Sequence, residues 1–457
     1  MLRKKGYGPI LLTLLLLLLW GGDAGGAAIR DLSALSQDPF AYVDRASEDH
    51  PLLPTEERIR LDSEYDALFF APWHQTTPRH TPEQVSWGFR EYGNNPGYGK
   101  NGRRHPPDWV RKMAVNAHLA DYPQGGFPAV TVNRADFRVL PTRQPHTSSP
   151  QRPGKEYPFD NLQESSIPAG TPILVTQVSR DRKWFLAETS SALGWVPFTD
   201  AAAVDPEFMK SWESGRYAAI IRDKATVRDE KGARCFLASL GAIFPKTGED
   251  AIRVWILTAV RDSKSKARLR KAWVQKAAVT EKPLSFTPRH TAQLAREMVG
   301  EHYGWGGVDG KRDCSSLIRD LFGPFGIWLP RNSGEQAGAG RFISLRNLPP
   351  AEKEALIISQ GIPWRTLLWT PGHIMLYIGV HQGQPLIFHN FWSIRTCDAE
   401  GENGRIVVGR AAVTTLHPGR ELSNRCLPQA DILHGLQGMT LLGEPPEAVM
   451  TPPGAAR

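Results

Sequence analysis

Cysteine is scarce in this sequence. The 457 residues include four cysteines, Cys235, Cys314, Cys397 and Cys426, which are too few for a disulfide scaffold in so long a chain. We expect Cys235 to fill a core position. Cys397 and Cys426 can pair if the protein meets an oxidising compartment, but sequence alone does not fix their geometry, so this pairing stays open. Cys314 would then remain a free thiol.

Long hydrophobic runs are almost absent as well. The exception, residues 10–20, is almost entirely leucine, and it is shorter than the ~18 residues that indicate a membrane-spanning helix. Basic residues precede it at positions 3–5, and mostly small residues follow it at 21–28. This order is typical of a secretory signal peptide over residues 1–28. We therefore expect an exported protein of the periplasm or cell envelope, with no membrane span in the mature chain.

The sequence also lacks a basic stripe interleaved with aromatic residues, the pattern of many nucleic-acid binding proteins. Its formal net charge of +8 is spread along the chain and suits an anionic partner such as a wall polymer. The densest basic run, residues 264–271, lies between two strand-like segments and is expected at a solvated hairpin tip. Nucleic acid is therefore not expected as a partner.

What the sequence contains is a series of segments with different patterns. Residues 29–125 are polar and rich in proline but also contain aromatic residues, which favours an ordered N-terminal stabilising segment that wraps around other domains over a disordered arm. Short β-rich runs fill residues 126–205 and recur at 216–280, which predicts two small all-β barrels related as a divergent repeat. A mixed domain of helices and strands follows at 287–443, and then a flexible tail at 444–457. The fold class is α+β.

The region around Cys314 is the most informative. Behind it, four apolar residues recur at the spacing of an amphipathic helix that a glycine and a proline end; these are Leu317, Ile318, Leu321 and Phe322. Asp313 is the expected N-cap. The thiol is thus placed in the first helical turn, where backbone N–H groups and the helix dipole favour a thiolate. Glycines that precede Asp313 are expected to let a substrate chain lie close to the sulfur. A buried structural cysteine is the alternative.

A cysteine nucleophile needs a base and a third group that orients the base. His373 opens a strand-like run, and His389 lies on the next one. A hairpin centred on His381 would place His373 directly opposite His389, about 5 Å apart at their Cβ atoms, with Asn390 on the opposite face. We therefore predict a catalytic triad of Cys314, His373 and His389. A satisfied histidine at a strand edge is the alternative for His373 alone.

At this point the sequence resembles the NlpC/P60 cysteine peptidases of bacterial cell-wall turnover. Four stretches of the last third of the chain are similar to that family, namely YGWGG at 303–307, DCSS at 313–316, PRNS at 330–333 and GHIMLYIG at 372–379. The layout also looks like the subgroup with an N-terminal stabilising segment and two bacterial SH3-like barrels before a papain-like catalytic domain. Ser316 stands where many members have glycine, and the spacing from His373 to His389 is longer than in compact members.

The resemblance implies a cysteine endopeptidase that hydrolyses the γ-D-glutamyl to diamino-acid bond of peptidoglycan stem peptides or muropeptides, in particular those with a free N-terminal L-alanine. It implies that Asp313, Ser315, Tyr303 and Ser333 bind substrate, with the Asp313 carboxylate on the L-alanine ammonium. A plain N-cap role for Asp313 and a core role for Tyr303 are the alternatives. An acidic or aromatic residue of the first barrel is expected to close the cleft. No metal or other cofactor is required, and we expect a monomer.

Other functions remain open. The same triad is compatible with an amidase that cuts between muramic acid and L-alanine. A non-catalytic peptidoglycan-binding protein, in which the barrels bind the wall, is a second alternative, although the intact Cys314 and His373 argue against it. Acyl transfer instead of hydrolysis would require an amine acceptor that the sequence does not reveal.

Overall fold

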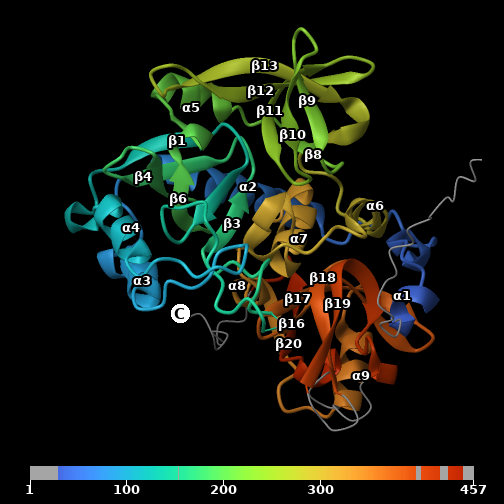
Figure 1. Ribbon diagram of the computed structural model, residues 1–457. Helices are drawn as coiled ribbons and strands as arrows, with labels where there is room; N and C mark the ends of the chain where they lie inside the picture. The colour runs from blue at the N-terminus through green and yellow to red at the C-terminus, as the bar shows by residue number, and fades with distance from the viewer. Residues whose placement is uncertain (1–28, 153, 398–402, 423–430, 446–457) are drawn as a thin grey trace, which may run out of the picture.

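The computed structural model describes residues 29–152, 154–397, 403–422 and 431–445 (Figure 1). The expected signal peptide, Cys426 with its pairing to Cys397, and residues 446–457 of the expected tail lie outside the described residues. The elements form an N-terminal helical segment, two seven-stranded sheets and a C-terminal domain built on a six-stranded sheet. This is the α+β class expected from the sequence.

Four α-helices form the N-terminal segment, together with short 3-10 turns at 39–42 and 119–121; the helices are α1 (Arg30–Ala34), α2 (Thr55–His74), α3 (Pro82–Tyr92) and α4 (Trp109–Ala117). Helix α2 is 20 residues long. Its Pro72 lies in the last turns and has no N–H to donate to the Leu68 carbonyl. This carbonyl accepts instead from the hydroxyl of Ser190 in the first sheet region.

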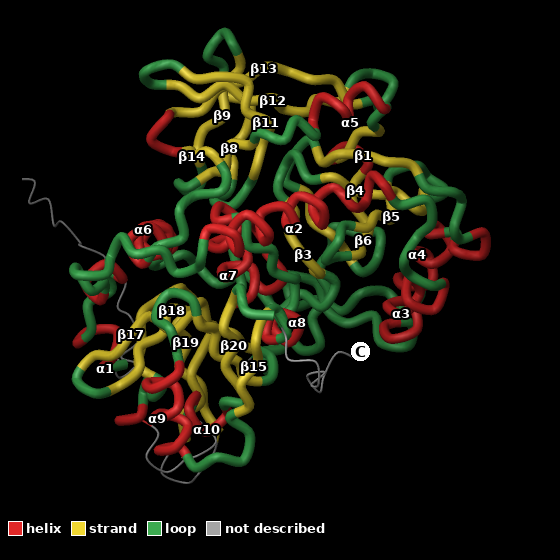
Figure 2. The backbone as a smooth tube through the Cα atoms, turned by 180° about the vertical axis from the view of Figure 1, so that it is seen from behind, coloured by secondary structure: helices red, strands yellow, loops and turns green. Residues whose placement is uncertain are grey.

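Helix α2 lies in the middle of the molecule, beside both seven-stranded sheets and α7 (Figures 1 and 2). The Trp73 indole is buried and donates to the Ala129 carbonyl at 2.6 Å. At the other end of the segment, the Asp31 carboxylate accepts from the Thr415 backbone N–H in the C-terminal sheet at 2.7 Å. The N-terminal segment thus contacts the domains on both sides, which confirms the expected wrapping arrangement.

The two seven-stranded sheets have the same strand order. The first contains β1 (Phe127–Thr131), β2 (Ala135–Arg138), β3 (Gln163–Ile167), β4 (Pro172–Val178), β5 (Trp184–Glu188), β6 (Leu193–Pro197) and β7 (Ala201–Ala203), in the order β3-β2-β6-β5-β4-β1-β7. After α5 (Pro206–Trp212), the second contains β8 (Tyr217–Ile220), β9 (Ala225–Asp229), β10 (Arg234–Ala238), β11 (Ile243–Glu249), β12 (Arg253–Arg261), β13 (Ala267–Gln275) and β14 (Val279–Glu281), in the order β10-β9-β13-β12-β11-β8-β14. The orders match strand for strand, as a divergent repeat predicts. We call these sheets the first and second barrel.

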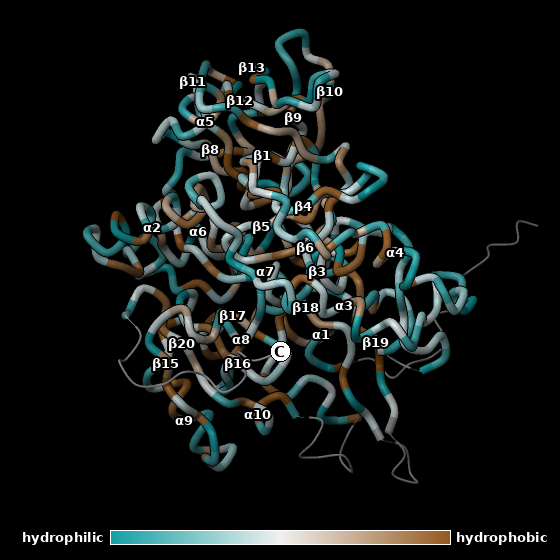
Figure 3. The backbone as a smooth tube through the Cα atoms, turned by 90° about the vertical axis from the view of Figure 1, so that its left-hand side faces the viewer, coloured by the Kyte–Doolittle hydropathy of each residue, from teal (hydrophilic) through white to brown (hydrophobic). Residues whose placement is uncertain are grey.

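Cys235 does not fill the core position expected from the sequence. It lies on β10, the edge strand of the second barrel, where it is half-buried as a free thiol. An edge strand lacks a neighbour on one side, so its side chains are less completely covered. Hydrophilic residues mark the turns at the periphery of the molecule (Figure 3). Among the described residues, no helix is long and apolar enough to cross a bilayer.

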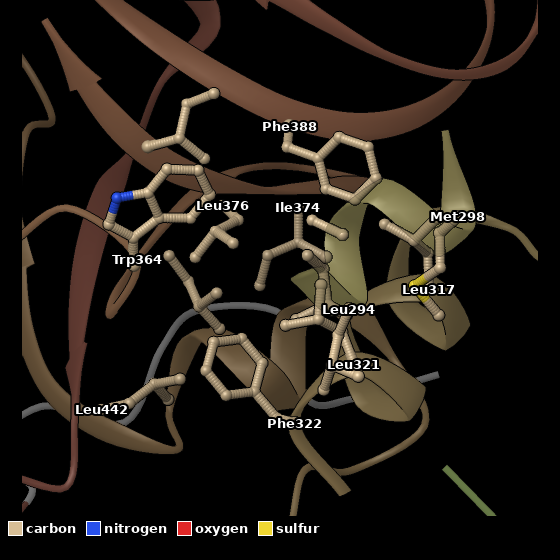
Figure 4. Close-up of a cluster of buried hydrophobic side chains, with 14 of the residues drawn as sticks. Leu294, Met298, Leu317, Leu321, Phe322, Trp364, Ile374, Leu376, Phe388 and Leu442 are labelled. Atoms are coloured by element: carbon tan, nitrogen blue, oxygen red, sulfur yellow. The ribbon is translucent and has the colours of Figure 1, made fainter. Parts of the chain in front are cut away.

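The C-terminal domain packs helices against a six-stranded sheet. Its elements are α6 (Pro288–Met298), a 3-10 segment at 305–310, α7 (Cys314–Phe322), α8 (Ser333–Ala337), β15 (Gly340–Ser344), α9 (Pro350–Gln360), β16 (Thr366–Thr370), β17 (His373–His381), β18 (Gln384–Cys397), β19 (Asn403–Thr415), α10 (Ile432–Gly435) and β20 (Gly438–Leu442). The sheet order is β15-β20-β16-β17-β18-β19. Leu317, Leu321 and Phe322 of α7 are fully buried against this sheet, beside Ile374 and Phe388 (Figure 4).

The hairpin of β17 and β18 differs from the expected register. The strands turn at Gln382 and Gly383, not around His381, and a bulge lies between Tyr377 and Gly379. Leu376 pairs with Phe388, so the expected direct opposition of His373 and His389 is wrong and they lie diagonally. The shift is by an even number of residues at this end of the hairpin, so both histidines stay on one face because side chains alternate with period two.

Candidate active site

Cys314 begins α7, as the sequence predicted. The Asp313 side chain accepts from the Ser316 backbone N–H at 2.9 Å, and the Ser316 hydroxyl accepts from the Asp313 N–H at 2.9 Å, which forms a capping box. Cys314 is 6% exposed. Its thiol donates to the Gly372 carbonyl at 3.9 Å, at the start of β17.

The charge state of Cys314 differs from the expectation. Burial, followed by the charge of Asp313, raises the pKa of the thiol to about 12, although the N–H groups of Ile374 and Ser315 act in the opposite direction. A helix N-terminus stabilises a negative charge by at most about 2 kcal/mol, which burial in this site outweighs. The resting cysteine is therefore a neutral thiol, and the expected preformed thiolate is wrong for the site without substrate.

His373 and His389 are joined by a short hydrogen bond. His373 Nε2 lies 2.8 Å from His389 Nδ1, and His389 Nε2 lies 3.0 Å from the Thr414 hydroxyl. The His389 ring is fully buried and stacks on Phe391 at a centroid distance of 4.1 Å. Burial lowers the pKa of His373 to about 4 and holds the pKa of His389 well below its usual range. Both rings are therefore neutral.

The direction of these bonds fixes the tautomers. The Thr414 hydroxyl donates to the Thr415 carbonyl at 2.8 Å, so it accepts from His389 Nε2–H. Nδ1 of His389 then carries no proton and accepts from His373 Nε2–H, because a neutral imidazole has one donor and one acceptor nitrogen. The result is a His373 ring whose Nδ1 lone pair is free to take a proton.

The thiol lies beside the backbone on both sides of His373. It bonds to the carbonyl of Gly372 and lies near the N–H of Ile374. Within the part of the chain that the structure describes, the sulfur and the His373 ring are not joined by a hydrogen bond. A proton transfer between them requires the S–H group to turn away from Gly372.

Asp313 and Arg331 form a buried ion pair next to the thiol. The guanidinium contacts both carboxylate oxygens, at 2.6 and 3.2 Å, and also bonds to the hydroxyls of Ser315 at 2.8 Å and Ser165 at 2.9 Å. Burial would raise the pKa of Asp313, but Arg331 and Ser316 outweigh it and lower this pKa to about 2. The carboxylate is therefore ionised and largely enclosed by its own protein.

Strand β3 of the first barrel lies directly on the glycine-rich turn before Cys314. A Cβ on Gly306 would lie 2.2 Å from the Gln163 carbonyl oxygen, and a Cβ on Gly307 would lie 2.5 Å from Ser166, and both glycines have positive φ. The Gln163 amide also donates to the Gly306 carbonyl at 3.2 Å. The absence of a side chain at these two glycines thus allows the first barrel to pack against the turn, whereas the sequence had suggested that it allows substrate to approach.

A cleft of about 630 Å³ opens above Cys314. Residues from three parts of the chain line it, including Trp87 and Tyr92 of α3, Asn161, Gln163 and Glu164 of the first barrel, and Tyr303, Trp305, Asp313, Cys314, Ser315, Arg331, Ser333, Trp369 and Gly372 of the C-terminal domain. Of the residues expected from the sequence, Cys314, Asp313, Ser315, Tyr303 and Ser333 therefore meet in one cleft. His373 directly follows Gly372 at its wall, and His389 lies behind His373.

Three contributors were missed at the level of sequence. Arg331 belongs to the PRNS stretch, and its position two residues before Ser333 is the signal in the sequence that points to it. The sequence predicted an acidic or aromatic residue of the first barrel at the cleft without identifying it; Glu164 is an acidic residue of that barrel that lines the cleft, and within the described residues its carboxylate has no hydrogen bond or salt bridge. Thr414 ends the histidine relay from β19, which pairs with β18, and no motif marked it.

Comparisons with known proteins identify four matched domains in the chain. Residues 300–396 match the NlpC/P60 family, residues 10–122 match the N-terminal NLPC_P60 stabilising domain, residues 145–197 match an SH3 domain of SH3b1 type, and residues 205–251 match an SH3 domain of SH3b2 type.

The chain is 33% identical over 150 residues to the peptidoglycan endopeptidase RipB of Mycobacterium tuberculosis, in a match that covers 27% of this chain and 51% of that protein. The chain thus spans about half the length of the curated relatives it matches. A solved NlpC/P60 endopeptidase from Photobacterium damselae subsp. piscicida is similar with a TM-score of 0.81 at 26% identity, over 90% of this chain and 98% of that chain. The chain therefore contains an NlpC/P60 domain, preceded by an N-terminal NLPC_P60 stabilising domain and two SH3-type domains.

Proposed function

We propose that this protein is a cysteine endopeptidase of the bacterial cell wall that cleaves the γ-D-glutamyl to diamino-acid bond of peptidoglycan stem peptides. Cys314 is the nucleophile, His373 the base and His389 the residue that orients the base. The observation that carries this assignment is the relay from His373 through His389 to Thr414, because it leaves a proton acceptor on His373, and the backbone on both sides of His373 contacts the buried thiol at the start of α7. RipB, a peptidoglycan endopeptidase by name, supports the substrate class and action outside the cytoplasm.

The neutral state of the pair sets the order of events. The Cys314 proton moves to Nδ1 of His373 as the sulfur attacks the γ-glutamyl carbonyl, since neither charge is stable in the resting site. A thioester forms, the C–N bond breaks and His373 returns the proton to the leaving amine of the diamino acid. His373 then takes a proton from a water molecule as its oxygen attacks the thioester carbonyl. The C–S bond breaks, which releases the acyl group as a carboxylic acid, and His373 returns the proton to the sulfur.

The developing oxyanion lies at the start of α7. Backbone N–H groups in the first turn have no partner within the helix, so they are free to donate to a negative oxygen. Tyr303, 8% exposed in the cleft wall, stays a phenol because burial raises its pKa. Its hydroxyl is a further donor toward substrate, and Ser315 and Ser333 supply hydroxyls at the same cleft.

The substrate ammonium is better matched by Glu164 than by Asp313. The Asp313 carboxylate is already bonded to Arg331, Ser316 and the Gly306 N–H. Glu164 of the first barrel lines the same cleft. We therefore assign the free N-terminal L-alanine to Glu164 and keep Asp313 as the charge that holds Arg331 and shapes the site.

Digestion of two synthetic peptides tests this function. Wild type should split L-Ala-γ-D-Glu-diaminopimelate into L-Ala-D-Glu and free diaminopimelate, and Cys314→Ala should release neither product. Glu164→Gln should raise KM for this peptide by about 10- to 100-fold, the loss expected for one charge-assisted hydrogen bond, and leave the N-acetylated peptide unaffected. Glu207→Gln, an exposed carboxylate on α5, is the matched control.

A muramyl-peptide, added as a third substrate, separates the alternative functions. An amidase would release an intact stem peptide from a muramyl-peptide and leave the γ-glutamyl bond whole, which mass analysis of the products detects. A non-catalytic binding protein would give no products from any of these peptides. Either result would refute the endopeptidase assignment.

A further inference from the structure

The second barrel exposes a pair of tryptophans on its outer face. Trp255 on β12 is directly opposite Trp273 on β13. Their neighbours Val254, Ile256, Ala272 and Val274 are buried in the barrel core, whereas both tryptophans are partly exposed. Because side chains alternate across a strand, the two indoles point outward. Neither indole belongs to a buried hydrophobic cluster of the described residues.

The first barrel shows what this face is like when it is covered. The shared strand order makes β6 the equivalent of β13, β5 of β12 and β2 of β9. Trp195 of β6 pairs with Leu186 on β5 and Arg138 on β2, just as Trp273 pairs with Trp255 on β12 and Arg228 on β9.

Trp195 and Leu186 are buried beneath Val85 of α3 and Ala117 of α4. Helices α3 and α4 lie on the first barrel, while β12 and β13 lie at the far end of the molecule from the C-terminal domain (Figures 1 and 2). The second barrel thus keeps an aromatic surface that its repeat covers with helices.

Charged side chains of both signs surround the pair, with Arg253 and Lys271 over the indole rings and Arg228 on the neighbouring strand. The Arg253 guanidinium lies 5.2 and 5.6 Å from the two indole centroids and pairs with Asp250 at 2.9 Å. The Lys271 ammonium lies 4.7 Å from the Trp255 centroid, with Glu230 at 3.8 Å. These pairs present both hydrogen-bond donors and acceptors around two flat apolar rings.

We propose that Trp255 and Trp273 form a saccharide-binding platform that takes the glycan strand of the wall polymer. The C–H face of a sugar ring suits the electron-rich face of an indole, and its hydroxyl and amide groups suit a rim that both donates and accepts. Two other ligands fit this face less well. A polyanion would be repelled by Asp250 and Glu230. An apolar helix would bury both ion pairs, which costs desolvation free energy. The choice of glycan rests on the proposed function, whereas the platform itself rests on the barrel comparison.

Co-sedimentation with insoluble peptidoglycan tests the platform. The full chain with Cys314→Ala, which cannot digest the polymer, should sediment with it, and a tetramer of N-acetylglucosamine should compete. Adding Trp273→Ala or Trp255→Ala should weaken binding by about tenfold or more, as truncation of a tryptophan anchor does at interfaces. Val407→Ala, an exposed apolar position on β19, is the matched control. Raising the salt concentration should change binding little, because the ligand ring is neutral.

Several outcomes would overturn the platform. Unchanged sedimentation of both tryptophan variants would do so, as would competition by free stem peptide but not by the sugar tetramer. Loss of self-association in the variants, seen by analytical ultracentrifugation, would assign the face to a second copy of the chain. The competition by the sugar tetramer is measured on the protein with both tryptophans intact. Its result therefore does not depend on whether the tryptophan variants fold.

Failure of the platform and failure of the proposed function are distinguishable. Trp273→Ala in the chain with Cys314 intact should cleave the soluble tripeptide at the wild-type rate, because the platform lies outside the cleft. A chain that binds glycan but cleaves no peptide would refute the function alone.

Discussion

The proton on His373 is placed by a chain of hydrogen bonds that ends at the Thr415 carbonyl. If Thr414 cannot accept, His389 loses the partner that keeps its proton on Nε2. In the opposite tautomer, His389 Nδ1–H would donate to His373 Nε2. The proton of His373 would then lie on Nδ1, so this nitrogen could not accept the proton of the thiol. The Thr414 hydroxyl, which reaches His373 through two hydrogen bonds, therefore controls whether His373 can accept the proton of Cys314.

Thr414→Val tests this control because it keeps the side-chain shape and removes the hydroxyl. We expect kcat to fall about tenfold with little change in KM, which corresponds to one buried hydrogen bond of roughly 1.4 kcal/mol. Thr414→Ser restores the hydroxyl and should recover most of the rate. Equal rates for the valine and serine variants would contradict the relay.

The acid limb of the pH profile is a second prediction at this scale. His373 acts as a base only when neutral, and burial lowers its pKa to about 4. kcat/KM should therefore be retained as the pH falls through the ordinary range of histidine and should be lost only near pH 4. An acid limb near 6.5, the unperturbed value for histidine, would show that the ring is charged at neutral pH.

At the scale of elements, the periodic patterns of the sequence located helices and strands correctly. Contacts between residues far apart in the sequence could not be predicted from these patterns. The apolar spacing after Cys314 and the capping residue Asp313 were enough to place α7, and alternating strands placed β17 and β18. The turn at Gln382 and Gly383 and the bulge beside Gly379 could not be predicted, because a shift by two residues leaves the same face buried. Arg331 was missed because its partners Asp313 and Ser165 lie 18 and 166 residues away in the sequence.

The Asp313–Arg331 pair ties α7 to the loop before α8 and to β3. Arg331→Met should lower the free energy of unfolding by about 3–5 kcal/mol, because it leaves the buried Asp313 carboxylate without its ion-pair partner. The depressed pKa of Asp313 contributes stability above its unfolded pKa, and this contribution is lost as the pH falls toward about 2. The difference between the variant and wild type in urea unfolding should therefore shrink in acid.

The double variant Arg331→Met, Asp313→Asn is the control for this prediction. It removes both charges, so it should recover part of the lost stability. An Arg331→Met protein as stable as wild type would mean that the pair does not hold these elements together.

At the scale of the whole molecule, buried ion pairs join the domains. Arg312 bonds to Asp223 of the second barrel at 2.9 Å, to Glu301 at 2.5 Å and to Asp320 of α7 at 2.7 Å. Lys282, after the second barrel, bonds to Asp62 and Asp66 of α2 at 2.5 and 2.7 Å. The sequence indicated several domains, but composition cannot show which charges meet between them.

Arg312→Met tests the coupling of the second barrel to the C-terminal domain. Three carboxylates would lose their shared cation, and burial already raises the pKa of Glu301, so the folded variant should take up protons. Its thermal stability should fall strongly at neutral pH and recover partly as the pH is lowered. Arg312→Lys, which keeps the charge but loses the planar fork, should be affected less. A variant that shows no pH dependence relative to wild type would argue against the cluster as a joint.

Trapping of the acyl-enzyme tests the catalytic pair most directly. Wild type mixed with L-Ala-γ-D-Glu-diaminopimelate and quenched in acid should carry an L-Ala-D-Glu acyl group on Cys314, located by mass spectrometry of its peptides, and His373→Ala should not accumulate it. Product release without any adduct on Cys314, or an adduct on a different residue, would contradict the account.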